Sequence, residues 1–360
     1  MSNVTEILGK LEKTHKQKLT LDGDDPPRLG TGIFAFDLAT GGGIPMGRVT
    51  VLYGSEGSMK SSLALKLIAQ AQREYPHLKC VYVDVEGHYS RPWAAQMGVD
   101  AEKLIVLAPQ SAEQVIDMVE SLLYADDIAV VVVDSLAAMV TERELGSDAE
   151  KAQVGSTGLM INKFYRKSGI ALGKAKMEGK FPTLVCINQI RFKVGVMFGN
   201  PETTPGGPSF NFASSMTIRL YGKDIKDPEI SKSLPAFRKV TGSVKKKKVE
   251  IVAQNFEFQL ALIQNPKFNL EVGQLYDHAS IITYLKAYDL IKKTDDGWLI
   301  EMDAESGLEN RVYPKQDDFK QDFKEDTVFA DALRKMIIRT VLTKGNKVEA
   351  EVEVKGGDDE

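Results

Sequence analysis

Residues 48–71 read RVTVLYGSEGSMKSSLALKLIAQA, and this segment decides the fold. Its first six residues are mainly apolar and β-branched, which is typical of a buried strand, and its last ten have the composition of a helix. A Gly/Ser-rich loop between a strand and a helix directs backbone N–H groups and a helix N-terminus at an anion. The segment therefore predicts a phosphate-binding loop.

Within this loop, the pattern G-x-x-x-x-G-K-[ST] assigns a function to individual residues. The Lys60 ammonium is expected to reach the β- and γ-phosphates, and the Ser61 hydroxyl to ligate Mg²⁺. Met59 stands where the pattern has its second glycine, with Gly57 two positions earlier. A simple Gly/Ser turn before a helix is the alternative. We expect nucleotide contacts from the whole loop: Gly54, Ser55, Glu56, Gly57, Ser58, Met59, Lys60, Ser61 and Ser62.

Composition places the chain among globular proteins that are not embedded in membranes. Of its 360 residues, 43% are hydrophobic and 27% are charged, and the net charge is -4. No apolar run approaches the ~20 residues needed to span a bilayer. Cys80 and Cys186 each lie in an apolar run, which favours two buried free thiols in a reducing compartment. We therefore expect a cytoplasmic protein.

From residue 29 to about residue 222, short apolar runs alternate with helical stretches. The runs are RVTVLY, CVYVDV, KLIVLA, IAVVVVDS, TLVCINQ and SMTIRLY. Nearly continuous Val/Ile/Leu runs are typical of a parallel sheet that is buried on both faces. The fold class predicted is therefore α/β, a phosphate-loop ATPase core with a mainly parallel central sheet and helices on both sides.

The flanking segments predict the domain organisation. Apolar residues at helical spacing indicate a helix over residues 4–18, and the breaker DGDDPPR follows it. Two further strands are expected within residues 245–263, closing one edge of the sheet. We predict four regions: an N-terminal helix and linker (1–28), the α/β core with the phosphate loop (29–268), a small C-terminal α+β subdomain (269–344) and an acidic tail (345–360).

Two carboxylates are expected beside the phosphate loop. Asp134 ends the run IAVVVVDS, and an acid at the tip of such a strand holds hydrated Mg²⁺ in phosphate-loop proteins. The run CVYVDVEG brings Glu86 to the same sheet edge, because ligands bind beyond the carboxyl ends of parallel strands. There Glu86 could orient and deprotonate an attacking water. Alone, either residue is a weak signal, since many buried strands end in an acid.

Residues 187–207, INQIRFKVGVMFGNPETTPGG, combine apolar side chains with cations on a segment rich in Gly, Pro and Asn. Val194 and Met197 lie near Arg191 and Lys193 in this segment. Stacked or wedged bases would cover such apolar residues, while cations hold phosphates. The alternative is a hydrophobic loop packed against its own core.

With these residues identified, the chain resembles the RecA-type strand-exchange recombinases over about residues 30–265. Residues 187–207 carry the most specific match, and LATGGGIPMGRVTVLYG (38–54) and VDSLAAM (133–139) also match. The resemblance implies an ATP- and Mg²⁺-using, DNA-dependent ATPase. Such a protein forms a helical filament on single-stranded DNA, pairs it with homologous duplex DNA and exchanges strands.

The resemblance also implies roles at the nucleotide. Glu86 matches the catalytic glutamate, and Lys60, Ser61 and Ser62 match the lysine and hydroxyl positions. Gln189 matches a glutamine that senses the γ-phosphate and passes its state to the DNA loop. The remaining matches are Asp134 to a Mg²⁺-associated aspartate and Trp93 to an aromatic residue stacked on adenine.

On the DNA side, the resemblance assigns contacts to one helix and one loop. Arg166 matches a contact to the DNA backbone, and Val194 matches an apolar wedge between base triplets. Gly206 and Gly207 match main-chain contacts. The run Lys245–Lys248 lies near the lysines that the family places across a neighbour's ATP, but its register stays open.

Differences between this sequence and the usual family pattern indicate a branch of the family. Met59 and the poorly matching C-terminal ninety residues lean toward the phage recombinases of the UvsX kind, which would act in a host cytoplasm. Single-strand-binding and mediator proteins are expected partners. Two alternatives stay open: a ring helicase or translocase with the same core, and a recombination mediator that binds ATP without hydrolysing it.

Overall fold

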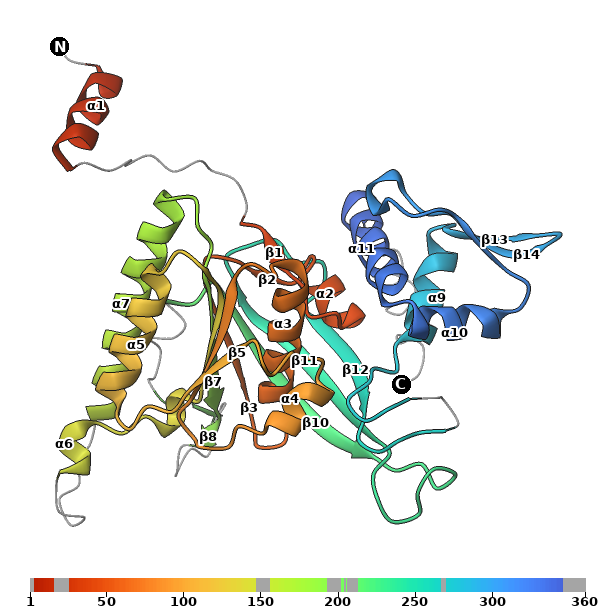
Figure 1. Ribbon diagram of the computed structural model, residues 1–360, viewed down its shortest axis with the longest axis horizontal. Helices are drawn as coiled ribbons and strands as arrows, with labels where there is room; N and C mark the ends of the chain where they lie inside the picture. Colours follow the sequence, from red (N-terminus) through yellow and green to blue (C-terminus); the bar gives the residue numbers. More distant parts are fainter. Residues whose placement is uncertain are drawn as a thin grey trace, which may run out of the picture.

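The computed structural model describes residues 3–15, 26–146, 156–192, 202–203, 205, 213–266 and 270–345. Its centre is an eight-stranded sheet with helices on both faces (Figure 1). The strand order is β12-β11-β10-β3-β7-β6-β4-β5. The bounds are β3 Val49–Gly54, β4 Lys79–Asp84, β5 Leu104–Leu107, β6 Ile128–Asp134, β7 Thr183–Gln189, β10 Met216–Ile225, β11 Phe237–Lys247 and β12 Asn255–Ala261.

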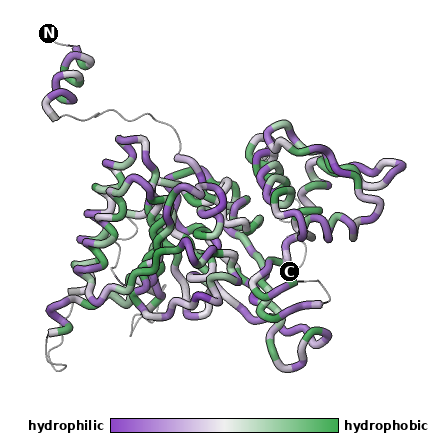
Figure 2. Tube along the Cα trace, viewed as in Figure 1, coloured by the Kyte–Doolittle hydropathy of each residue, from purple (hydrophilic) through white to green (hydrophobic). Residues whose placement is uncertain are grey.

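Six neighbouring strands of this sheet, from β10 to β5, run parallel, as the apolar runs predict. Alternate side chains enter two separate cores, since successive residues of a strand face opposite ways. Leu52 and Tyr82 belong to the core on one face, whereas Val51 and Val83 belong to the core on the other. Figure 2 shows the hydrophobic strands concentrated at the centre of the molecule. The predicted α/β fold is confirmed.

The helices divide between the two faces of the sheet. Residues of α3 (Lys60–Glu74) and α2 (Phe34–Ala39) pack into the first core, and those of α5 (Ala112–Tyr124) and α7 (Ser156–Met177) pack into the second. The remaining helices and short strands of this part are α1 Val4–His15, α4 Arg91–Gln96, α6 Glu142–Leu145, β1 Arg28–Leu29, β2 Ile44–Pro45, β8 Arg191–Phe192 and β9 Glu202–Thr203.

One edge of the sheet is antiparallel, where β10, β11 and β12 form a meander. The prediction of two strands within residues 245–263 is right in kind but wrong in its bounds. The first strand begins at Phe237, well before Lys245, and its charged and glycine-containing sequence lacks the apolar alternation of a half-buried strand. Lys245–Lys247 are only the end of β11.

Helix α1 carries an exposed apolar stripe. Val4, Ile7 and Leu11 are 71%, 45% and 41% exposed, and they recur at the spacing of one helix face. The helix stands apart from the sheet in Figure 1. The expected helix over 4–18 is described as far as His15, and residues 16–18 lie outside the described chain.

The C-terminal subdomain forms a separate lobe beside the sheet (Figure 1, blue). Its own core draws on aromatic and aliphatic residues of its helices, and Phe34 and Leu38 of α2 complete it. Phe36, on the same short helix, belongs to the first core of the sheet instead. Helix α2 therefore joins the two parts. The elements of the lobe are α9 His278–Ala287, β13 Ile291–Thr294, β14 Gly297–Ile300, β15 Arg311–Tyr313, α10 Gln316–Glu325 and α11 Thr327–Lys344.

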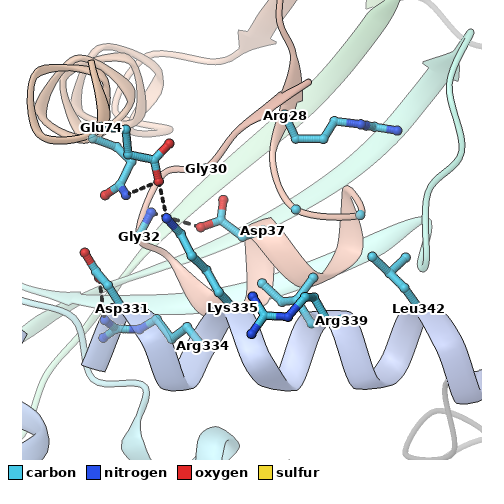
Figure 3. A pocket seen from close by; sticks show the side chains of 14 residues that line it. Arg28, Gly30, Gly32, Asp37, Glu74, Asp331, Arg334, Lys335, Arg339 and Leu342 are labelled. Atoms are coloured by element: carbon cyan, nitrogen blue, oxygen red, sulfur yellow. Dashed lines mark hydrogen bonds and ion pairs between the residues drawn. The ribbon is translucent and has the colours of Figure 1, made fainter. Parts of the chain in front are cut away.

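Polar contacts also hold α11 against the core. A cavity of about 270 Å³ lies between the α2 region and α11. Figure 3 shows Lys335 reaching from α11 to Glu74. The Lys335 Nζ lies 2.5 Å from Glu74 Oε1, and Gln70 donates to the same carboxylate oxygen at 2.8 Å. Glu74 is in α3, which begins at the phosphate loop, so one helix connects that loop to the C-terminal subdomain.

Candidate nucleotide-binding site

The phosphate loop follows β3 and runs directly into α3, as predicted. Lys60 is buried, and its Nζ donates to the carbonyls of Gly54 and Ser55 at 3.1 and 2.7 Å. Burial lowers the pKa of Lys60, and the acids Asp134 and Glu86 oppose that shift. The ammonium is thus held at the centre of its own loop, with the carboxylates of Asp134, Glu86 and Glu56 near it.

Met59 occupies the loop position where the motif has glycine, and its backbone conformation explains why the motif has glycine there. The residue has φ 68 and ψ 24, in the left-handed region that favours glycine. A side chain is accommodated there because it packs on the first core. The irregularity is therefore compatible with the usual loop conformation, at the cost of a strained backbone of about 1 kcal/mol.

Asp134 and Ser61 meet beside the loop. The Ser61 hydroxyl donates to Asp134 Oδ2 at 2.6 Å, and the Tyr82 hydroxyl donates to the same oxygen. Burial raises the pKa of Asp134, while its two hydrogen bonds oppose the shift. Hydroxyl and carboxylate oxygens side by side are the donors that Mg²⁺ prefers. The sequence analysis did not single out Tyr82, because its contact with Asp134 joins two different strands.

Glu86 lies on the loop after β4 and has three polar neighbours. Ser135 donates to its Oε1, Gln189 Nε2 donates to the same oxygen at 2.9 Å, and His88 Nδ1 lies 3.5 Å from its Oε2. The structure thus brings Glu86 and Gln189 together, although 103 residues separate them in the chain. Two donors hold Oε1 of this half-buried carboxylate, and Oε2 can orient a water molecule.

Asp84 organises the loop that carries Glu86. Its carboxylate accepts backbone N–H groups of Gly87, His88 and Tyr89 at 2.9, 3.2 and 2.9 Å. Asp84 therefore caps the turn that presents Glu86.

Trp93 is tied to the phosphate loop through its ring nitrogen. Its Nε1–H donates to Ser62 Oγ at 3.0 Å, which brings this indole against the start of α3. Ser90 is the N-cap of α4, with its hydroxyl accepting from the Trp93 backbone N–H. Ser62, at the start of α3, and Trp93 therefore lie side by side next to the phosphate loop.

Arg238, on β11, is a loop contact that the sequence did not reveal. Its Nη1 donates to the Gly57 carbonyl at 2.5 Å, and its Nε lies 2.5 Å from Asp224 Oδ1, the residue paired with it across β10 and β11. Gly222 allows the approach, because a Cβ there would lie 2.4 Å from the Gly57 carbonyl oxygen. A long-range contact of this kind has no local sequence signal.

The segment predicted to grip DNA begins next to Gln189. Asn188 is buried and donates to the Pro205 carbonyl at 3.1 Å, and β8 pairs with β9 in an antiparallel ribbon. Arg191 lies in β8. The other predicted contacts of the segment, Lys193, Val194, Met197, Gly206 and Gly207, lie outside the described residues.

Among the described residues, some of the cations in the basic stretch Lys163–Lys180 form ion pairs within the protein, and others do not. Lys167 pairs with Glu120 and Asp117 of α5, and Lys180 pairs with Asp126 and Glu178. Arg166 is exposed on α7. Part of this charge therefore joins helices of the protein to each other, and Arg166 is left available at the surface.

Lys246 belongs to the run Lys245–Lys248, whose alignment with the family's interface lysines is open. It is half-buried, and its side chain points back to the sheet. Its Nζ donates to the Ser214 carbonyl at 2.8 Å, and burial lowers its pKa. Lys245 and Lys248 are exposed.

Comparison with known proteins gives the family. The model of the RecA N-terminal domain matches residues 17–265. The chain belongs to the RecA family. The Protein RecA of Aquifex aeolicus (strain VF5) is 42% identical over 193 residues, which are 53% of this chain and 54% of that protein.

Two further RecA relatives show the same extent of similarity. The Protein RecA of Thermus aquaticus is 41% identical over 201 residues, 55% of this chain and 57% of that protein. The mitochondrial DNA repair protein recA homolog of Dictyostelium discoideum is 40% identical over 193 residues, 53% of this chain and 41% of that protein. The chain spans about half the length of the curated RecA proteins it matches.

Across the described ranges, none of the helices combines the length and apolarity that crossing a bilayer requires. Within the same ranges, no group of three or more His, Cys, Asp or Glu side chains converges as a metal site. Cys80 and Cys186 are free and buried, and burial raises both thiol pKa values.

Proposed function

We propose that this protein is an ATP-dependent recombinase that forms a helical filament on single-stranded DNA, pairs it with homologous duplex DNA and exchanges strands. The observation that carries the proposal is the hydrogen bond from Gln189 to Glu86. It joins the nucleotide site to the residue that directly precedes the DNA-binding segment 190–207. Membership of the RecA family supports the same function.

In this proposal the phosphate loop and its neighbours bind ATP. Lys60 holds the β- and γ-phosphates, the backbone from Gly54 to Ser62 surrounds them, and Trp93 stacks on the adenine. Trp93 already lies against Ser62, which supports a base at that position. The protein is then a DNA-dependent ATPase whose core spans residues 29–268.

Ser61 and Asp134 would hold Mg²⁺, since their oxygens lie 2.6 Å apart and are of the type that this ion takes. When bound, the ion supplies charge neutralisation to the phosphates. Hydrolysis itself is assigned to Glu86, which orients a water and accepts its proton as the water oxygen attacks the γ-phosphorus. The bond from that phosphorus to the bridging oxygen breaks, and ADP leaves.

DNA contacts are proposed for two regions. Arg166 on α7, together with Arg191 and Lys193, would contact the phosphate backbone. Val194 and Met197 would wedge between bases, and Gly206 and Gly207 would contribute main-chain contacts. The exposed side chain of Arg166 supports the first part.

Filament growth is assigned to region 1–28. The exposed apolar stripe of α1 needs a cover, and the core of an adjacent copy would provide it. A head-to-tail contact of this kind need not close into a ring. Regions 269–344 and 345–360 are proposed as the C-terminal subdomain and an acidic tail.

Finer identity is also part of the proposal. Met59 in the phosphate loop supports the phage UvsX-like branch. The protein would then work in the host cytoplasm, with single-strand-binding and mediator proteins as partners.

Electron microscopy tests the function directly. The full chain is imaged with single-stranded DNA and a non-hydrolysable ATP analogue, and with ADP as the comparison. Extended helical filaments with the analogue are the expected result. Closed rings would instead indicate a helicase or translocase, and filaments on a protein without ATPase activity would indicate a mediator.

A further inference from the structure

A second candidate site lies between α3 and the C-terminal subdomain. The cavity there has a volume of about 770 Å³ and is lined from the core by parts of α3 and residues 96–98. Residues 274–277, α10 and α11 line the other side. None of its lining residues belongs to the phosphate loop.

The cavity is cationic, although the whole chain has a net charge of -4. Its lining holds five cations and two carboxylates. The cations are Lys66, Arg73, Lys320, Lys324 and Arg334, and the carboxylates are Asp277 and Asp331. A local excess of this sign attracts anions to a partly enclosed space.

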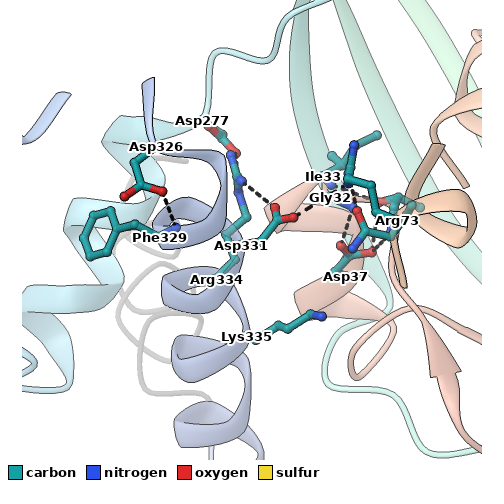
Figure 4. Close-up of polar contacts among 12 residues, drawn as sticks. Gly32, Ile33, Asp37, Arg73, Asp277, Asp326, Phe329, Asp331, Arg334 and Lys335 are labelled. Atoms are coloured by element: carbon teal, nitrogen blue, oxygen red, sulfur yellow. Dashed lines mark hydrogen bonds and ion pairs between the residues drawn. The ribbon is translucent and has the colours of Figure 1, made fainter. Parts of the chain in front are cut away.

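Arg334 engages both carboxylates. Its Nη2 lies 3.2 Å from Asp277 Oδ2, and its Nη1 lies 3.3 Å from Asp331 Oδ1 (Figure 4). Arg73 reaches Asp331 only at 3.9 Å, and half of its side chain is exposed. The two acids are therefore largely used by one guanidinium, and among the described residues neither acid forms an ion pair with Lys66 or Lys324.

Lys66 is the most informative of these cations. Within the described residues, its ammonium has no hydrogen-bond or ion-pair partner. Burial lowers its pKa to about 8, and Arg73 and Arg334 add to the shift, whereas Asp277 opposes it. A cation withdrawn from water without a partner costs free energy. An uncompensated cation in a cleft is a reason to look for a ligand.

We propose that this cavity binds a phosphate oxyanion, with Lys66, Arg73 and Lys324 as its cationic contacts. The volume exceeds that of a single phosphate, which favours a ligand with several phosphates. Two sources share this chemistry: a free inorganic polyphosphate and the phosphate backbone of DNA. The proposal does not rest on ATP hydrolysis or filament formation.

Binding would also clamp the two parts of the molecule. Lys66 and Arg73 are in α3 of the core, and Lys324 is in α10 of the C-terminal subdomain. A ligand that contacts both sides stabilises the folded protein against unfolding. Thermal unfolding is therefore a suitable readout.

The experiment uses the full chain saturated with Mg²⁺ and ADP, so that the phosphate loop is occupied throughout. Tripolyphosphate is added in one arm and a short duplex oligonucleotide in the other, with potassium chloride at equal ionic strength as the control. Lys66→Met is compared with Lys79→Met, which changes an exposed lysine, and with Lys66→Arg, which keeps the cation.

We expect tripolyphosphate to raise Tm by about 3–8 °C in the parent, Lys79→Met and Lys66→Arg, but not in Lys66→Met. A rise with the duplex alone, again lost in Lys66→Met, would assign the site to DNA backbone. Equal shifts in the parent and in Lys66→Met, or no shift in either arm, would overturn the proposal. ATPase activity of Lys66→Met should equal that of the parent, so failure here is separate from failure of the proposed function.

Discussion

Gln189 at the end of β7 donates a hydrogen bond from Nε2 to Oε1 of Glu86, over 2.9 Å. The two residues belong to different strand ends, and Gln189 directly precedes the segment predicted to bind DNA. On its other side, Asn188 holds the Pro205 carbonyl near the far end of that segment. A change at the γ-phosphate that moves Glu86 would thus alter the hydrogen bonding of Gln189, next to the DNA segment.

Replacing Gln189 tests this connection. Gln189→Ala removes the donor to Glu86 and leaves the Glu86 carboxylate in place. We expect single-stranded DNA to stimulate ATP hydrolysis strongly in the parent and by less than about twofold in the variant, because the link between the sites is lost. Steady-state ATPase assays with and without DNA measure this. Gln110→Ala, at an exposed position, is the matched control, and normal stimulation in Gln189→Ala would refute the link.

Glu86→Gln separates binding from hydrolysis. The amide keeps the shape of the side chain but cannot accept a proton from water. We expect kcat to fall by about 100-fold or more, with nucleotide affinity unchanged within about threefold. Fluorescent-nucleotide titration and ATPase assays give the two quantities, with Glu102→Gln as a surface control. Retained turnover would remove Glu86 as the base.

Arg238→Met tests the support of the phosphate loop. The guanidinium fixes the Gly57 carbonyl, and its loss frees the tip of the loop. We expect KM for ATP to rise about 3- to 10-fold with kcat little changed, as for loss of one charge-assisted hydrogen bond. Lys239→Met changes the next residue of the strand and serves as the control. An unchanged KM would show that the contact is dispensable.

Val194→Asp tests the base wedge. A carboxylate cannot enter a stack of bases and repels phosphates, so affinity for single-stranded DNA should fall at least about tenfold. Fluorescence anisotropy with a labelled oligonucleotide measures the affinity, and circular dichroism checks the fold. Val328→Asp adds the same charge at an exposed position of α11. If Val194→Asp bound DNA like the parent, Val194 would not be the wedge.

Lys66 predicts a pH dependence of stability. Its pKa is about 8 in the folded chain, below the 10.5 of an unperturbed lysine, so the folded state binds this proton less tightly. The protonated lysine therefore costs stability below pH 8, and the cost disappears as pH rises through 10.5. In phosphate-free buffer near pH 7, the free energy of unfolding of Lys66→Met should exceed that of the parent by about 1–2 kcal/mol. This difference is smaller than the full pKa shift would give, because Lys66 is partly exposed to solvent. Urea unfolding between about pH 7 and about pH 10 should show the gap closing.

Much of the nucleotide site was predictable because its residues have local signals. A strand that runs into a Gly/Ser loop and a helix marks Lys60 and Ser61, and an acid at the end of a buried strand marks Asp134. The structure brings Ser61 and Asp134 into contact, and it brings Glu86 and Gln189 together. Their roles in catalysis stay predictions.

Contacts between distant strands could not be predicted in the same way. Arg238 reaches Gly57 because β10 and β11 continue past the end of β3, and the sequence of β11 has no regular apolar alternation. The cationic cavity likewise depends on how the C-terminal subdomain docks on α3, which no motif encodes. The start of β11 was misplaced for the same reason.

The affinity of the unmodified protein for single-stranded DNA, measured with a non-hydrolysable ATP analogue and again with ADP, tests the central claim most directly. The claim is that the bound nucleotide controls the affinity for single-stranded DNA through Glu86 and Gln189. We predict binding at least about tenfold tighter with the analogue than with ADP, a difference of about 1.4 kcal/mol. Equal affinities in the two nucleotide states would contradict the account.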